Sequence, residues 1–73
     1  MTPEKAMSYA REDIADLRQA LTRSDCQTLH ASIIGYCRAL VDCGLISAAQ
    51  RQLLIAEAGA ELSNWRESTQ PRA

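Results

Sequence analysis

The chain has 73 residues, with eight basic and nine acidic side chains and a net charge of −1. This length allows one domain, and so short a chain buries only about 60% of the surface that its unfolded form exposes. The scattered, nearly neutral charge argues against nucleic-acid binding, which needs clustered Lys and Arg. No apolar run approaches the ~20 residues of a transmembrane helix, and the N-terminus lacks a signal-peptide pattern, so we expect a cytoplasmic protein.

The composition indicates an all-α protein. Hydrophobic residues make up 47% of the chain, but there is no Phe, two Tyr and one Trp. The core must therefore be built mainly from Leu, Ile, Ala, Cys and Met, which suits the packing of helix on helix. Three Gly and two Pro leave few turn residues for a β-sandwich or barrel.

The first helix is predicted over residues 3–22. Thr2 can cap its N-terminus, Pro3 suits the first helical position, and Glu4 places a negative charge at the positive end of the helix dipole. Apolar residues then recur every three or four positions, as in a coiled-coil seam. They are Met7, Ala10, Ile14, Leu17 and Leu21.

The second helix is predicted over residues 25–43. Ser24 and Gln27 form a possible capping box at its start, and Gly44 stands where a left-handed C-terminal residue is expected. Its main apolar seam consists of Cys26, Leu29, Ile33, Tyr36, Leu40 and Cys43.

The third helix is predicted over residues 48–67, with Ser47 and Gln50 as a second capping box. Its apolar stripe ends at Trp65, which we expect in the core. Residues 1–68 then form a single domain, and residues 69–73 a flexible tail. Because the connections are short, the three helices should form an up-down-up bundle, or a helical hairpin with the third helix folded back.

The middle helix carries two further stripes that call for a partner. One is apolar and consists of His30, Ile34, Cys37 and Val41, and the other is small and consists of Thr28, Ser32, Gly35 and Ala39. We expect the small stripe to pack closely on Ala58–Gly59–Ala60. A helix that is apolar nearly all round must be buried nearly all round. We therefore predict that a second chain covers His30, Ile34, Cys37 and Val41. That chain is expected to be a second copy, which makes the protein a homodimer, and the alternative is a target protein bound at the same stripe.

No catalytic or metal-binding constellation stands out. The three cysteines are an odd number and are too far apart on one helix to bridge, so we expect buried free thiols. His30 is the only histidine, and with Cys26 it supplies two metal ligands where a site needs three or four. We expect no enzyme activity and no cofactor or metal ion.

The chain is therefore predicted to be a non-enzymatic protein-interaction module that inhibits or scaffolds a larger protein complex, like small bacterial accessory proteins encoded by phages or plasmids. The candidate partner surface is Tyr9, Arg11, Glu12, Asp16 and Arg18. The alternative is a nucleic-acid-binding regulator, because residues 39–54 are superficially similar to a helix-turn-helix that would use the helix after Ser47. Against that alternative stand the long flanking helices and the absence of a basic surface.

Overall fold

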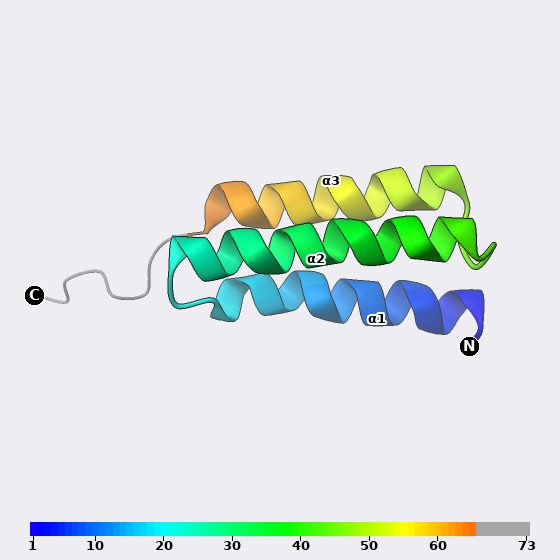
Figure 1. Cartoon of the computed structure of the whole chain (residues 1–73), viewed down its shortest axis with the longest axis horizontal. Coiled ribbons are helices and arrows are strands. Elements are labelled where there is room, and N and C mark those ends of the chain that lie inside the picture. The colour runs from blue at the N-terminus through cyan, green and yellow to red at the C-terminus, as the bar shows by residue number, and fades with distance from the viewer. Residues whose placement is uncertain (66–73) are drawn as a thin grey trace, which may run out of the picture.

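A computed structural model describes residues 1–65 of the chain, and these residues contain helices and no strand. Helix α1 spans Pro3–Asp16, α2 spans Arg23–Asp42 and α3 spans Ala48–Asn64, with a short 3-10 turn, η1, at Leu17–Gln19. Consecutive helices run antiparallel, so the order is up-down-up (Figure 1). Each helix contacts both others. The predicted all-α fold is confirmed.

Two of the predicted N-terminal caps are present. The Thr2 hydroxyl accepts a hydrogen bond of 3.1 Å from the Lys5 amide, with Pro3 in the first turn of α1. At α3, the Ser47 hydroxyl accepts from the Gln50 amide at 3.0 Å, and the Gln50 side chain accepts from the Ser47 amide at 2.8 Å. This capping box satisfies two backbone donors that α3 cannot pair internally.

The connection between α1 and α2 differs from the prediction. Helix α1 ends at Asp16, and Ala20 adopts an extended backbone conformation with ψ 135°. Thr22, not Ser24, caps α2 by accepting a hydrogen bond of 3.0 Å from the Asp25 amide. Because the chain leaves the helix before Leu21, this side chain does not continue the apolar seam, and it is 63% exposed.

The end of α2 follows the prediction at Gly44, which has φ +76°. The Gly44 amide donates to the Val41 carbonyl oxygen and the Leu45 amide to the Leu40 carbonyl oxygen, each at 2.9 Å. This pair of bonds is the Schellman arrangement, in which a left-handed residue turns the chain out of the helix. Glycine is suited to this position because a Cβ would be strained there.

Helix α3 ends at Asn64, and Trp65 leaves it with an extended backbone, ψ 138°. The prediction of a helix over residues 48–67 is therefore wrong at Trp65, which the helix does not include. Residues 66–73, with the predicted tail at 69–73, lie outside the described part of the chain.

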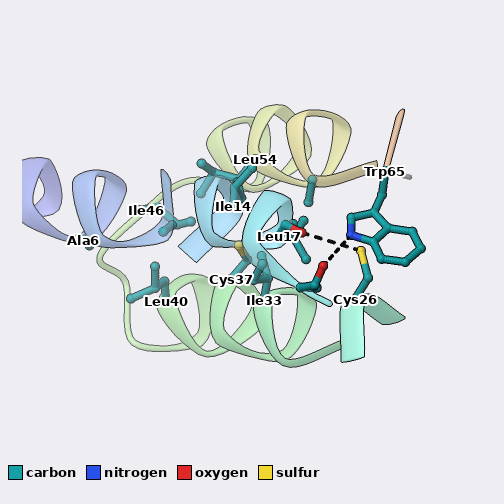
Figure 2. Packing of buried hydrophobic residues seen from close by; sticks show 13 residues of the cluster. Ala6, Ile14, Leu17, Cys26, Ile33, Cys37, Leu40, Ile46, Leu54 and Trp65 are labelled. Carbon is teal, nitrogen blue, oxygen red and sulfur yellow. Dashed lines mark hydrogen bonds between the residues drawn. The ribbon is translucent and has the colours of Figure 1, made fainter. Parts of the chain in front are cut away.

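The core runs between the three helices, with Leu17, Cys26, Cys37 and Leu54 completely buried (Figure 2). Each buried Leu contributes roughly 1.5–3 kcal/mol relative to an exposed one. Trp65 is 6% exposed and lies beside Cys26 at one end of the core, as predicted. The remaining core residues are Ala6, Ala10, Ile14, Ala20, Ile33, Leu40, Ile46 and Ala58.

The core side of α2 lies between the two apolar stripes predicted for it. Cys26, Ile33, Cys37 and Leu40 point within about 60° of one another at 3.6 residues per turn, and all four are buried. Leu29 and Tyr36 flank this line on one side, and His30, Ile34 and Val41 flank it on the other. The apolar character of α2 is thus used within one chain, because α2 packs between α1 and α3.

The predicted close packing of the small stripe is wrong. Thr28, Ser32, Gly35 and Ala39 are all exposed and lie on the side of α2 opposite the core line. A Cβ added at Gly35 or at Gly59 would meet no atom within 4 Å, so neither glycine marks a close approach of two helices. The outer face of α2 therefore consists of small residues, and this stripe exposes no large apolar side chain to water.

Candidate functional site

The predicted partner surface does not form one continuous patch. Arg11 and Arg18 lie against α3, where each guanidinium makes two hydrogen bonds to a glutamate. Arg11 binds Glu57 at 3.2 and 3.0 Å, and Arg18 binds Glu61 at 2.9 and 2.7 Å. These two ion pairs tie α1 and η1 to α3, and they occupy both arginines within the chain.

The ion pairs alter the acidity of their members. Hydrogen bonding to Glu57, and the charge of that residue, raise the pKa of Arg11, and Glu61 does the same to Arg18. The hydrogen bonds from Arg18 hold the pKa of Glu61 below its usual value, although desolvation opposes them. Both arginine side chains remain at least half exposed, so water screens the pairs.

A shallow groove of about 750 Å³ runs along the outer side of α1 toward the start of α3, and Glu12 lines it with Arg11, Met7 and Gln50. This groove holds charges of both signs. It therefore has no strong preference for the charge of a ligand, and Glu12 lines this groove but neither of the two described next.

Asp16 faces α2 instead, and Tyr9 lies close enough to Tyr36 of α2 to raise the pKa of its hydroxyl. A groove of about 270 Å³ between α1 and α2 is lined by Asp13, Asp16, Leu29 and Tyr36, together with Ser32 and Ile33. A second groove, of about 500 Å³, is lined by Asp16, Leu21, Asp25 and Leu29, with Gln19, Ala20 and Thr28. Because Asp16 and Leu29 line both grooves, the two form one continuous surface.

We call this surface the α1–α2 face. Its members are Tyr9, Asp13, Asp16, Leu21, Asp25, Leu29 and Tyr36. The side chains of Tyr9, Leu21 and Leu29 are 44%, 63% and 38% exposed, so the face presents several large apolar groups to water. Tyr36 is half-buried. Desolvation raises the pKa of its hydroxyl, and nearby Asp13, Cys37 and Tyr9 raise it further, which keeps the hydroxyl protonated.

The face is also acidic. Among residues 1–65, no Lys, Arg or His lines either of its grooves. Asp13, Asp16 and Asp25 belong to none of the ion pairs in the described part of the chain. The face thus combines exposed apolar side chains with carboxylates that have no positive counterpart among the residues that the structure describes.

Sequence reasoning found Tyr9 and Asp16 but missed Leu21, Leu29, Asp25 and Tyr36 as surface residues. The spacing of three and four residues predicts that Leu21, Leu29 and Tyr36 belong to core seams, and of these Tyr36 does pack against the core with part of its surface in water. The signal that could have separated Leu21 was the tandem Thr22–Arg23–Ser24, in which Thr22 caps α2 and forces Leu21 out of any helix.

The four residues of the predicted dimer stripe do not share one environment: one lies in the core and three lie on the flank of α2. Cys37 is 0% exposed and lies in the core of its own chain, so its assignment to an interface is wrong. Burial raises the pKa of the Cys37 thiol, and Asp13 raises it further, whereas Arg51 lowers it. His30, Ile34 and Val41 are half-buried on the flank of α2 opposite Leu29 and Tyr36.

Residues 39–54 do not have helix-turn-helix geometry. The two helices of that motif cross at about 90–120°, whereas α2 and α3 lie side by side and antiparallel (Figure 1). This segment is a helical hairpin. In it, the Nε atom of Arg51 is buried and has no hydrogen-bond partner among residues 1–65.

In the described part of the chain, no three His, Cys, Asp or Glu side chains come together in a way that could hold a metal ion. The structure also contains, within residues 1–65, no helix that is both long and apolar enough to cross a membrane. Comparison with protein-family models, with curated proteins and with solved structures gave no match to this chain, so a functional argument starts from the α1–α2 face itself.

Proposed function

We propose that the protein is a non-enzymatic protein-interaction module that binds a larger protein through the α1–α2 face and thereby inhibits or scaffolds it. The observation that carries this proposal is the exposure of Leu21 and Leu29, which line one groove on a single side of the bundle. Contiguous exposed apolar side chains on a small domain mark interaction surfaces.

The packing of the bundle supports the same role. The helices hold the face in place through a shared core and through the Arg11–Glu57 and Arg18–Glu61 ion pairs. A surface that is already ordered loses little conformational entropy on binding. Such a surface suits steric blocking or bridging of a partner, which is how small accessory proteins of this size act, including those encoded by phages or plasmids.

The test compares two exposed leucines. Leu21 is 63% exposed on the α1–α2 face, and Leu53 is 57% exposed on α3, outside that face. Leu21→Glu and Leu53→Glu each add one charge at a position where the side chain contacts little, so both variants should fold. Circular dichroism checks this.

The immobilised wild-type chain and the two variants are each exposed to an extract of the source organism, and the retained proteins are identified by mass spectrometry. We expect at least one protein that the wild type and Leu53→Glu retain and that Leu21→Glu loses. A retained set that Leu21→Glu leaves unchanged would contradict the proposal.

A second candidate is self-association through the half-buried flank of α2, formed by His30, Ile34 and Val41 without Cys37. The observation in its favour is that all three side chains keep part of their surface in water on one flank of α2, where Val41 also packs against the core. Light scattering tests it. A homodimer has twice the monomer mass of 8.0 kDa, and Ile34→Glu should return it to that mass. An 8.0 kDa mass for the wild type at micromolar concentration would reject this candidate.

A further inference from the structure

We infer that the occupant of the α1–α2 face is a positively charged amphipathic helix of the partner protein. This inference rests on the proposed function, because it adds the chemistry of the partner at the same surface. Three properties of the face lead to it: its apolar groups, its uncompensated charge and its shape.

The apolar groups require a partner with apolar side chains. Leu21 and Leu29 line the same groove, and Leu29 also lines the groove that contains Tyr36. Burying an exposed Leu side chain is worth roughly 1.5–3 kcal/mol when the burial is complete. These side chains therefore supply anchors for two or three apolar residues of a ligand.

The charge requires that the same ligand be basic. Asp13, Asp16 and Asp25 surround the apolar groups, and within residues 1–65 no cationic side chain lines the grooves with them. An uncharged ligand that covered these carboxylates would take water from them without compensation. Lys or Arg beside the apolar residues of the ligand would pair with them and would also speed association.

The shape favours a helix. The grooves run between two helices, and residues 25 and 36 of α2 mark their extent, which at 1.5 Å per residue is about 16 Å, or three helical turns. The described part of the chain has no strand, so it offers no sheet edge for an extended peptide to join. An amphipathic helix lying in a groove between helices is a recurrent mode of recognition.

The charge also excludes other occupants. A second copy joined face to face by a two-fold axis would bring the aspartates of one chain against the same aspartates of the other. Phosphate groups of nucleic acids and anionic lipids would meet the same repulsion. A basic helix of another protein satisfies both the apolar and the acidic components of the face.

The test uses two synthetic peptides of about 14 residues, roughly four helical turns. Both carry Leu along one stripe, and the flanking positions are Lys in one peptide and Glu in the other. Binding to the full chain is followed by the shifts of backbone amide signals in NMR spectra. We expect the Lys peptide to bind at least about tenfold more tightly than the Glu peptide, a difference of about 1.4 kcal/mol. The shifted signals should come from the α1–α2 face.

Matched variants identify the carboxylates. Asp16→Asn should weaken binding of the Lys peptide about threefold or more. Glu4→Gln should leave it unchanged, because Glu4 lines the other groove and lies 12 residues, about 18 Å at 1.5 Å per residue, along α1 from Asp16. Raising the salt concentration should reduce the difference between the two peptides.

Failure of this inference differs from failure of the proposed function. If the Lys peptide does not bind, binds no better than the Glu peptide, or shifts signals of α3 instead, the inference of a basic helix is wrong. In that case a Leu21-dependent protein in the extract experiment would still support protein binding at the face. If Leu21→Glu changes nothing in that experiment, the proposed function fails as well.

Discussion

The indole Nε1 of Trp65 donates a hydrogen bond of 3.0 Å to the carbonyl oxygen of Ala20, a residue 45 positions earlier in the chain (Figure 2). This bond fastens the end of α3 to the connection between α1 and α2. The Arg23 guanidinium lies over the same ring, 5.5 Å from its centre. The extended conformation of Ala20, which turns Leu21 toward the α1–α2 face, is therefore held from the other side of the bundle.

Removing this hydrogen bond should destabilise the fold. Trp65→Phe keeps an aromatic ring in the core but leaves the buried Ala20 carbonyl oxygen without its indole donor. We expect it to lower the free energy of unfolding by about 1–2 kcal/mol. Trp65→Ala, which also creates a cavity, should cost about 3–5 kcal/mol. Urea unfolding followed by circular dichroism measures both, and equal stability of Trp65→Phe and the wild type would show that the bond contributes nothing.

Alanine at either of the two helical glycines, Gly35 and Gly59, should make the fold more stable. No atom lies within 4 Å of a Cβ built at Gly35 or Gly59. Gly35→Ala and Gly59→Ala should therefore raise the free energy of unfolding by about 0.5–1 kcal/mol each, since alanine loses less backbone entropy in a helix. Thermal unfolding measures the change.

Gly44→Ala serves as the control, because the same substitution should here lower the stability. Gly44 has φ +76°, and a left-handed conformation costs a residue with a Cβ about 1–2 kcal/mol. This variant should lose stability in the same assay. If Gly35→Ala also lost stability, a second chain would have to pack against the small stripe of α2, and the exposed placement of that stripe would be contradicted.

The three cysteines should differ in reactivity. Cys26 and Cys37 are completely buried and Cys43 is exposed. Burial raises the pKa of the Cys26 and Cys37 thiols, which lowers their thiolate fraction further. A thiol reagent should therefore modify one cysteine quickly in the native protein and all three after unfolding. Fast modification that persists in Cys43→Ser would contradict the burial of the other two.

The Arg18–Glu61 pair should make stability depend on pH. The pKa of Glu61 is lower in the folded chain than in the unfolded one, where it is about 4.3. Its contribution is therefore complete above the unfolded pKa and is lost as the pH falls through the lower, folded pKa. Glu61→Gln should reduce the loss of stability between about pH 7 and about pH 3, and high salt should diminish the effect in the wild type. An identical pH profile for the variant would show that the pair is fully screened.

The helices themselves could be predicted because their signals are local. The Ser47–Gln50 box, the Thr2–Pro3 start and the Gly44 stop depend on residues that are neighbours in sequence, and all three are present in the structure. The register of α2 could not be predicted with the same certainty. Spacings of three and four residues describe both flanks of a helix packed between two others, and only the third helix decides that Cys37 lies in the core while Leu29 reaches water.

The candidate site depended on contacts that are distant in sequence. Arg11 and Arg18 belong to the same helical region as Tyr9 and Asp16, and nothing local shows that Glu57 and Glu61 would bind them. Once α3 occupies the arginines, the charged side chains that line the two grooves between α1 and α2 are all acidic. The preference of the α1–α2 face for a basic ligand is therefore a consequence of the tertiary fold.

The most direct test of the protein-binding role places a photo-crosslinking amino acid at Leu29 or at Leu53 of the chain expressed in its source organism. Both side chains reach water, but only Leu29 lies on the α1–α2 face. We predict that irradiation links the Leu29 position to another protein, that Asp16→Asn weakens this product, and that the Leu53 position gives no comparable product. A product formed from Leu53 and absent from Leu29 would contradict the assignment of the α1–α2 face as the binding surface.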